Sequence, residues 1–247
     1  MNFCDNGTTL IVPFYFTLCA TMSLPVRSHA TSASFTNPGK DCARCPRLCS
    51  FRAINQQKFP DKYNAPVPGF GDLATARLLV VGLAPGLRGA NFSGRPFTGD
   101  FAGDLLYSAL LRFGHARGTY AARIDDGVEL VRARITNAVR CVPPENKPTP
   151  AEIKICRDFL RDEIAALPQL QVILTLGTIS HDSTLRALSL KPSAYKFGHG
   201  AVHHLENGLK IVNTYHSSRY NVNTGRLTHA MFDDIFRLID RELGEKA

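Results

Sequence analysis

The stretch from Leu78 to Phe101 constrains the fold more than any other part of the chain. It opens with an apolar run, Leu-Leu-Val-Val, that is typical of a strand buried on both faces of a parallel sheet. Seven glycine and proline residues then follow before a helical pattern resumes near Asp100. Such a loop lets the backbone approach a ligand closely at the carboxyl end of a sheet. The alternative is a plain connection with several turns, but long loops inside compact domains are more often functional, so we expect a site here.

The loop and the overall charge narrow the class of ligand. No Gly-Lys-Ser/Thr follows the loop, as a Walker loop requires, and its glycine spacing differs from the dinucleotide fingerprint. The chain carries 29 Lys and Arg against 21 Asp and Glu, a net charge of +8 with a pI near 9.3. A basic surface favours a phosphate-bearing partner without identifying one.

Apolar runs and helical patterns alternate along the rest of the chain, which predicts a parallel sheet with helices on both faces. One helix start is especially clear, because Thr149, Pro150 and Glu152 match an N-cap, a first-turn proline and a capping box. Residues 53–75 and the histidine-containing loop 195–204 are expected to be irregular. Strands are expected from Leu78 and at 132–139, 172–176 and 210–214, and helices at about 100–113, 149–167, 177–188 and from beyond 228 to 243.

Residues 1–40 are expected to form a leader or a poorly ordered tail, and 41–247 a single domain. Leu10–Ala20 resembles a signal-peptide core, yet no Lys or Arg precedes it and Pro13 interrupts it. Met22 offers a second start, so we expect the biological chain to begin there. No apolar run approaches the roughly 20 residues needed to cross a bilayer.

Cysteines supply a second candidate site. Cys42 and Cys45 are separated by two residues, so a single turn can bring both thiolates to one metal centre. Cys141 and Cys156 form a second, wider pair. Four cysteines in a cytosolic chain favour a metal site over disulfides. From the residues alone a zinc site, a redox pair and free thiols all stay open, and Cys49 is left over.

Three sequence motifs occur in order along the chain, and together with the four cysteines they point to one family. They resemble the uracil-DNA glycosylase superfamily, specifically its iron–sulfur family 5, also called type b. The resemblance runs from about Cys42 to the C-terminus. The motifs are Gly82-Leu-Ala-Pro-Gly86 with Gly94-Arg-Pro-Phe-Thr-Gly99, then Thr136-Asn-Ala-Val-Arg-Cys141, then His216-Ser-Ser-Arg219 with Thr224-Gly-Arg-Leu-Thr228.

The resemblance implies a three-layer α/β/α sandwich with a central four-stranded parallel sheet. It also implies a [4Fe-4S] cluster held by Cys42, Cys45, Cys141 and Cys156, with Cys49 left to packing. The implied activity is base excision repair. A glycosylase of this kind flips uracil, hypoxanthine or xanthine out of double-stranded DNA and hydrolyses the N-glycosidic bond. The implied protein is a cytoplasmic monomer with DNA as its partner.

Each motif supplies implied site residues. Phe97 matches the aromatic side chain that stacks on the flipped base, Asn137 the amide that pairs with the base edge, and His216 the donor to the base oxygen as negative charge develops. Leu83 stands where other branches carry a polar residue that positions water, so Asn91 is a candidate for that role. Gly82, Ala84 and Gly86 are expected to line the base pocket.

The DNA contacts follow from the same motifs. Arg219 and Tyr220 are candidates for the wedge that fills the hole left by the base, and Arg88, Arg95 and Arg226 for phosphate contacts. Ser217 stands where relatives carry proline, which predicts a more flexible loop around His216. Two other hypotheses stay open: a catalytically weak iron–sulfur protein that binds damaged DNA, suggested by Leu83, and a zinc-dependent nucleic-acid binder.

Overall fold

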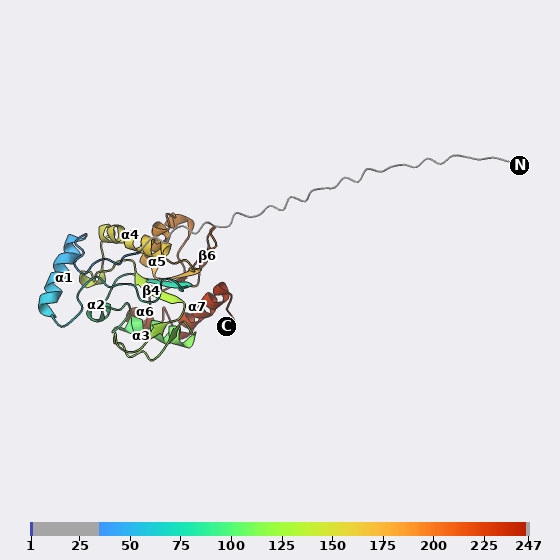
Figure 1. The fold of residues 1–247 in the computed structure, drawn as a ribbon. Coiled ribbons are helices and arrows are strands. Elements are labelled where there is room, and N and C mark those ends of the chain that lie inside the picture. The colour runs from blue at the N-terminus through green and yellow to red at the C-terminus, as the bar shows by residue number, and fades with distance from the viewer. Residues whose placement is uncertain (2–34, 246–247) are drawn as a thin grey trace. The chain divides into compact units, whose positions relative to one another are not determined.

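The computed structural model describes residues 35–245, together with Met1 (Figure 1). The signal-like segment and the second start at Met22 lie outside the described residues. The described residues from Phe35 onward belong to one compact unit. Within this part of the chain, no helix is long and apolar enough to cross a membrane.

A mixed five-stranded sheet forms the centre of the molecule, and the predicted α/β class is confirmed. Four strands are parallel, as expected, but the sheet has a fifth, antiparallel strand at its edge, so the expected count of four was wrong. This edge strand lies in the histidine-containing loop that we expected to be irregular. It is three residues long and lacks an apolar run, so its only signal is its pairing with the neighbouring strand. In sheet order the strands are β4 (Ala133–Asn137), β1 (Leu78–Gly82), β5 (Val172–Leu176), β7 (Lys210–Thr214) and β6 (Val202–His204).

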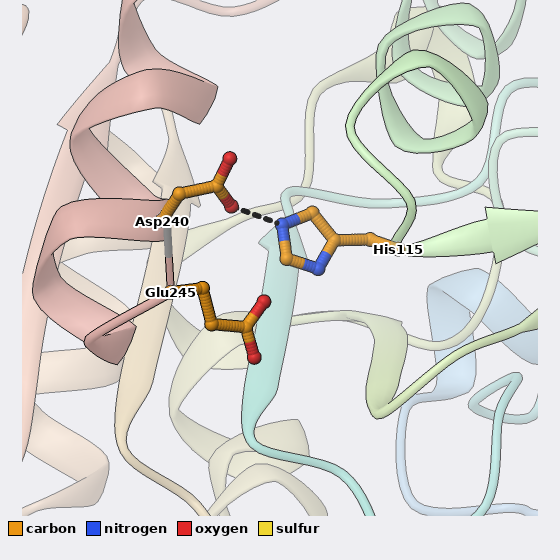
Figure 2. Close-up of side chains that lie close together, drawn as sticks. All are labelled: His115, Asp240 and Glu245. Atoms are coloured by element: carbon orange, nitrogen blue, oxygen red, sulfur yellow. Dashed lines mark hydrogen bonds and ion pairs between the residues drawn. The ribbon is translucent and has the colours of Figure 1, made fainter. Parts of the chain in front are cut away.

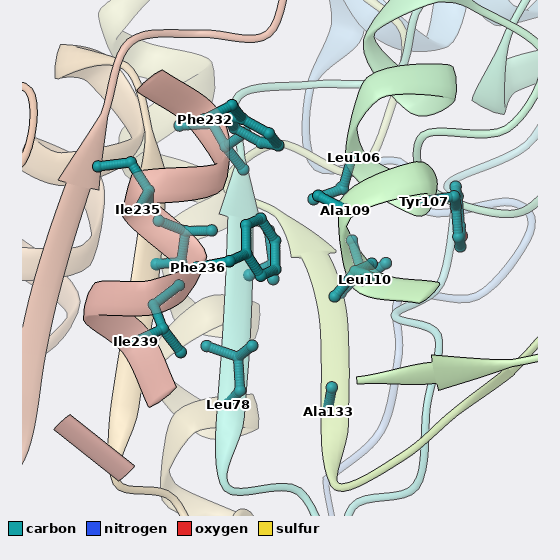
Figure 3. Close-up of a cluster of buried hydrophobic side chains, with 14 of the residues drawn as sticks. Leu78, Leu106, Tyr107, Ala109, Leu110, Ala133, Phe232, Ile235, Phe236 and Ile239 are labelled. Carbon is teal, nitrogen blue, oxygen red and sulfur yellow. The ribbon is translucent and has the colours of Figure 1, made fainter. Parts of the chain in front are cut away.

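Helices cover both faces of this sheet. Side chains alternate along β1, so that Leu78 and Val80 pack toward α3 (Phe101–Arg112) and α7 (His229–Leu243), as Figure 3 shows for Leu78. Leu79 and Val81 pack on the other face, toward α4 (Pro150–Ala165) and α5 (Thr178–Ala187). Both sides of β1 are therefore buried, which is why its sequence is a continuous apolar run.

Local sequence signals explain where these helices start. Thr149 caps α4 through a complete capping box, in which its hydroxyl accepts from the Glu152 N–H and the Glu152 carboxylate accepts from the Thr149 N–H. Asp100 caps α3 by accepting from the Gly103 N–H at 3.0 Å. Thr228 caps α7 in the same way by accepting from the Met231 N–H at 3.1 Å. Each cap satisfies a backbone donor that the helix itself leaves free.

Smaller elements surround the sandwich. The first of them, α1 (Pro46–Lys58), starts directly after Cys45 and includes the first six residues of the segment 53–75, so that segment is irregular only beyond Lys58. The glycine loop also contains a short helix, which its many glycines gave no reason to expect. The remaining elements are α2 (Ala90–Ser93), the hairpin of β2 (Ala116–Arg117) and β3 (Glu129–Leu130), α6 (Arg219–Asn223), and the 3-10 turns η1 (Pro144–Asn146) and η2 (Pro192–Ala194).

The topology collects the sequence motifs at one edge of the sheet. Gly82 and Asn137 are paired neighbours at the carboxyl ends of β1 and β4. The chain leaving β1 passes to the face covered by α3, whereas the chain leaving β5 passes to the face covered by α5. A crevice forms in an α/β sheet where neighbouring connections diverge in this way. The expected site on the glycine loop therefore lies at such a crevice.

Candidate active site

A cavity of about 310 Å³ opens at the carboxyl edge of the sheet. Its lining includes five residues that the sequence analysis selected, which come from three separate motifs: Ala84, Gly86, Phe97, Asn137 and His216. The volume lies at the lower end of the range for small-ligand pockets. The motifs therefore meet around a cavity of the size that a small ligand requires.

Gly82 does not line this cavity, but it allows two lining side chains to approach each other. A Cβ atom at Gly82 would overlap the Asn137 amide oxygen and lie 2.5 Å from Cζ of Phe97. Asn137 is only 3% exposed, and its Oδ1 has no hydrogen-bond partner among the described residues. Leaving a buried polar atom unpaired costs on the order of 1–3 kcal/mol. A ligand that donates a hydrogen bond to Asn137 would recover that energy.

Phe97 is held in a strained backbone conformation. Its φ of 54° lies in the left-handed region, which is rare for an aromatic residue. The Tyr120 hydroxyl donates to the Phe97 carbonyl at 3.2 Å, and a Cβ atom at Gly103 would overlap that same carbonyl. Strain of this kind persists where the surroundings fix it, and it concentrates at functional sites.

His216 follows β7 and is held by two hydrogen bonds of its loop. The Asn221 amide donates to the His216 carbonyl at 2.8 Å. The Ser217 hydroxyl donates to the Ala102 carbonyl at 3.3 Å, and Ser217 is fully buried. The structure therefore gives no support to the expected flexibility of this loop, because the serine provides an anchor to α3 that proline lacks.

Asp100 is a site residue that the sequence analysis missed. It lines the same cavity, and a Cβ atom at Gly89 would collide with its carboxylate, while one at Gly86 would lie 3.0 Å from it. Burial raises the pKa of Asp100, an effect that nearby His216 opposes. Burial lowers the pKa of His216, opposed by Asp100. The one sequence signal was its place just after the glycine loop, which we interpreted only as a helix start.

The water-positioning role suggested for Asn91 does not fit its position. Asn91 is buried, is not part of the cavity lining, and donates from Nδ2 to Oδ1 of Asn64 at 2.8 Å. Asn146 does line the cavity, with a φ of 56°. Its position in a proline-rich connection gave no sequence signal for a site.

Arg95 also takes a place different from the expected one. Its side chain is 3% exposed and forms a bidentate ion pair with Asp126, at 2.8 and 2.7 Å, whose side chain is fully buried. The rings of Phe70, Tyr107 and Tyr120 surround the guanidinium. A phosphate cannot reach this group, so Arg95 supports the glycine loop from within the protein.

The other DNA-contact candidates lie on the surface. Arg88, Arg219 and Arg226 are exposed, and none has a carboxylate partner within the described part of the chain. The guanidinium of Arg226 lies 4.6 Å from the Tyr215 ring centroid, and that of Arg219 lies 5.4 Å from the Phe101 ring. Tyr220, in α6, is 73% exposed, which is unusual for a large aromatic side chain.

The cysteines meet in a separate cavity. Cys42, Cys45, Cys49, Cys141 and Cys156 all line it, together with residues of α1 and α4. Burial and the neighbouring thiols raise the pKa of Cys45 to about 11 and that of Cys141 to about 12. Thiols with such high pKa values become thiolates only when a metal ion is bound to them.

The spacing of the thiols and the charges around them describe the site that a metal centre would occupy. A zinc ion bound by thiolates at about 2.3 Å would hold them roughly 3.8 Å apart. Among the described residues, no three cysteine sulfur atoms lie within 4.8 Å of one another. Arg52, only 9% exposed, points Nη1 at the Cys141 sulfur, 3.9 Å away, and donates to the Cys42 carbonyl at 3.0 Å. A buried cation beside thiols suits a group with net negative charge, which four thiolates give both to a zinc ion and to an iron–sulfur cluster.

A further group of metal-binding residue types lies elsewhere (Figure 2). Nε2 of His115 and Oδ1 of Asp240 are 2.9 Å apart, and Glu245 lies beside them. The Glu245 carboxylate already pairs with Arg77 at 2.6 Å and with Arg132 at 3.1 Å. Because two guanidiniums oppose a cation here, these residues form an ion-pair network that fixes the end of α7.

The fold and the site define an α/β protein with a small ligand cavity, lined by an aromatic ring, an amide, an imidazole and a carboxylate, and with a cysteine centre beside it. The sequence matches the Uracil DNA glycosylase superfamily over residues 68–240. The chain belongs to this superfamily.

Relatives at about 40% identity share a single name. A Type-5 uracil-DNA glycosylase of Thermus thermophilus is 41% identical over 208 residues, which cover 82% of this chain and 94% of that protein. The Type-5 uracil-DNA glycosylase of Pyrobaculum aerophilum is 38% identical over 214 residues, which cover 85% of this chain and 92% of that protein. The Type-5 uracil-DNA glycosylase of Mycobacterium bovis is 42% identical over 204 residues, which cover 79% of this chain and 76% of that protein.

Proposed function

We propose that this protein is an iron–sulfur uracil-DNA glycosylase that removes uracil and other deaminated bases from double-stranded DNA. The observation that carries the proposal is the cavity that joins Phe97, Asn137, His216 and Asp100 at the sheet edge. The bond to be broken is hidden inside a duplex, so the nucleotide must first be flipped into this cavity. The product strand then carries an abasic site for base excision repair.

Three residues bind the flipped base. The Phe97 ring stacks on it, and the unpaired Oδ1 of Asn137 accepts a hydrogen bond from its edge. His216 donates to the base oxygen from a neutral ring, because burial lowers its pKa below the ordinary value. As the bond between C1′ and the base nitrogen breaks, the electron pair stays on the base. The donor then faces a growing negative charge, which makes its bond stronger in the transition state.

Asp100 supplies a polar group that can position water, which the apolar side chain of Leu83 cannot do. We assign it to the attacking water: the carboxylate orients the water toward C1′ and takes its proton as the new C–O bond forms. The base leaves as an anion and takes up a proton from solvent. This assignment also weakens the hypothesis of an inactive DNA-binding protein, since that hypothesis rested on the absence of a polar group at position 83.

The exposed residues around the cavity mouth serve DNA binding. Tyr220 and Arg219 suit a wedge that enters the base stack, because an exposed aromatic side chain can replace the flipped base. Arg88 and Arg226 suit phosphate contacts, which position the duplex without reading its sequence.

We propose that the cysteine cavity holds a [4Fe-4S] cluster, with Cys42, Cys45, Cys141 and Cys156 as its ligands. When bound, the cluster supplies a structural link rather than a chemical step, since it joins α1 to the loop that follows Asn137. The Cys49 thiol donates to the Cys42 carbonyl at 3.3 Å and stays outside this ligand set.

The experiment that tests this function compares base release from duplexes that contain uracil, hypoxanthine or xanthine, with single-stranded uracil DNA alongside. Leu83 leaves one wall of the cavity apolar, so we expect release of all three bases from duplexes. Release of uracil alone would narrow the function to that base. Release of none of them would contradict the proposal and favour a protein that only binds damaged DNA.

A further inference from the structure

A third cavity, of about 540 Å³, is bordered by α4 and α5. It shares no lining residue with the active-site cavity, so it is a separate feature of the surface. Its lining includes four basic residues and one acidic residue, Asp158; the basic residues are Lys154, Arg157, Arg161 and Arg186. We refer to it as the α4–α5 cavity.

The acidic residue of this cavity is already paired. Arg161 contacts Asp158 at 2.9 Å and Asp162 at 3.0 Å, so its charge is balanced. Asp158 is also 3.7 Å from Arg44. Over residues 35–245, Lys154, Arg157 and Arg186 have no carboxylate within ion-pair distance. Three positive charges are therefore left facing one hollow.

Arg157 is the least satisfied of these groups. Its Nε is buried and has no hydrogen-bond partner in the described structure. Arg186, which also lines the cavity, brings a second positive charge to the same hollow. An unpaired buried donor beside a like charge destabilises the fold, and a bound anion would offset both costs.

We propose that the α4–α5 cavity binds a phosphate group between Arg157 and Arg186. A guanidinium presents its N–H groups in a planar fork that matches phosphate oxygens, and two such groups bind one phosphate from different sides. Lys154 adds a third positive charge, and Ser189 places a hydroxyl in the lining. The phosphate belongs either to a DNA backbone or to a small phosphate compound, and the experiment separates these two sources.

The first part of the experiment measures binding of inorganic phosphate to the purified holoprotein by calorimetry, at an ionic strength kept constant with chloride. Arg186→Gln should weaken phosphate binding about tenfold or more, because hydrogen bonds to charged groups are worth that much. Arg186 is exposed, so the variant should fold normally. Arg237→Gln is the matched control, since this exposed arginine lies in α7, on the other face of the sheet, and pairs with Asp234.

The second part measures the affinity for an undamaged duplex as a function of salt. If the site takes a backbone phosphate, Arg186→Gln should reduce the slope of log affinity against log salt by about 0.9. If phosphate binding falls while the slope stays the same, the ligand is a small phosphate compound. The proposal is overturned if Arg186→Gln matches the parent in both measurements. Neither measurement uses base release, so this result is independent of the glycosylase assignment.

Discussion

At the scale of single residues, the cavity combines groups whose protonation depends on burial. Asp100 and His216 line the same cavity, and burial shifts the pKa of the carboxyl upward and that of the imidazole downward. Both shifts favour the neutral form. The neutral ring of His216 still has one N–H to donate, whereas Asp100 must lose its proton before it can accept one from water.

His216→Ala should slow base release by about 100- to 1,000-fold, the usual effect of removing one donor to a developing negative charge. Affinity for a uracil duplex should stay nearly unchanged, because that bond strengthens only in the transition state. Single-turnover rates and binding curves measure the two effects separately. His204→Ala, at an exposed position paired with Glu242, serves as the control. A variant with parental rates and lost affinity would make His216 a DNA-contact residue.

Asp100→Asn tests the carboxylate without removing the helix cap, since asparagine caps as well as aspartate does. The parent rate should fall on acidification, because burial raises the pKa of Asp100 above its ordinary value and the protonated acid cannot accept a proton from water. The variant should be slower at neutral pH and should lose this acid limb. Asp104→Asn, in the exposed first turn of the same helix, should keep the parental pH profile. If the rate of Asp100→Asn still falls at acidic pH as the parent's does, another group causes that fall.

The sequence predicts where a residue lies when a motif fixes its position, and fails to do so where packing decides the position. Phe97, Asn137 and His216 each stand at a strand end or in the glycine loop, so the topology brought them together. Arg95 stands in the same loop, yet Asp126, 31 positions away, determines its orientation. No local pattern indicates such a partner.

At the scale of elements, the glycine loop depends on a support from the following hairpin. Asp126→Asn would leave Arg95 buried without a counter-charge, which typically costs about 3–5 kcal/mol. For a domain of this size we expect Tm to fall by roughly 6–20 °C in calorimetry. Asp125→Asn removes the neighbouring exposed pair with Arg123 and should have little effect. An equal fall in Tm for the two variants would show that the pair of Arg95 with Asp126 does not stabilise the glycine loop.

The pairing with Arg95 also holds the pKa of Asp126 well below its ordinary value. The ionised form is therefore the one that stabilises the fold. Its contribution is complete above the unfolded pKa, near 4, and is lost as the pH falls toward the lower folded value. In Asp126→Asn this part of the acid sensitivity should be absent.

The cysteine cavity makes a prediction about α1 and the cluster. Cys45→Ser should bleach the brown colour and lower Tm, because it removes one of the four proposed ligands. Cys49→Ser should keep both the visible absorption and the iron content, since this thiol is assigned to a hydrogen bond with the Cys42 carbonyl. If Cys49→Ser loses the colour and Cys45→Ser keeps it, Cys49 is the ligand in place of Cys45.

The sequence predicted the elements that carry a strong local signal. Strands 172–176 and 210–214 occur with the expected bounds, and the capping box at Thr149 forms as expected. By contrast, α1 was missed because its residues are mostly polar, and β6 because three residues at a sheet edge have no period to detect. Both depend on tertiary contacts, with the cysteine centre and with β7 respectively.

At the scale of the whole molecule, we propose that base release takes place in one cavity at the carboxyl edge of the sheet. In the proposed function, the positive charge and the exposed arginines serve DNA binding, and the cysteine centre fixes the arm and the loop beside the cavity. The hypothesis of a protein that binds damaged DNA without cleaving it shares all of these features except the chemical step. Only a measurement of the product separates the two.

The most direct test incubates the holoprotein with a uracil-containing duplex and identifies the products by liquid chromatography and mass spectrometry. We expect intact free uracil in equal amount to an abasic strand. The double variant Asp100→Asn/His216→Ala should release almost none while still binding the duplex. A parent protein that binds the duplex tightly but releases no free base would contradict the glycosylase assignment.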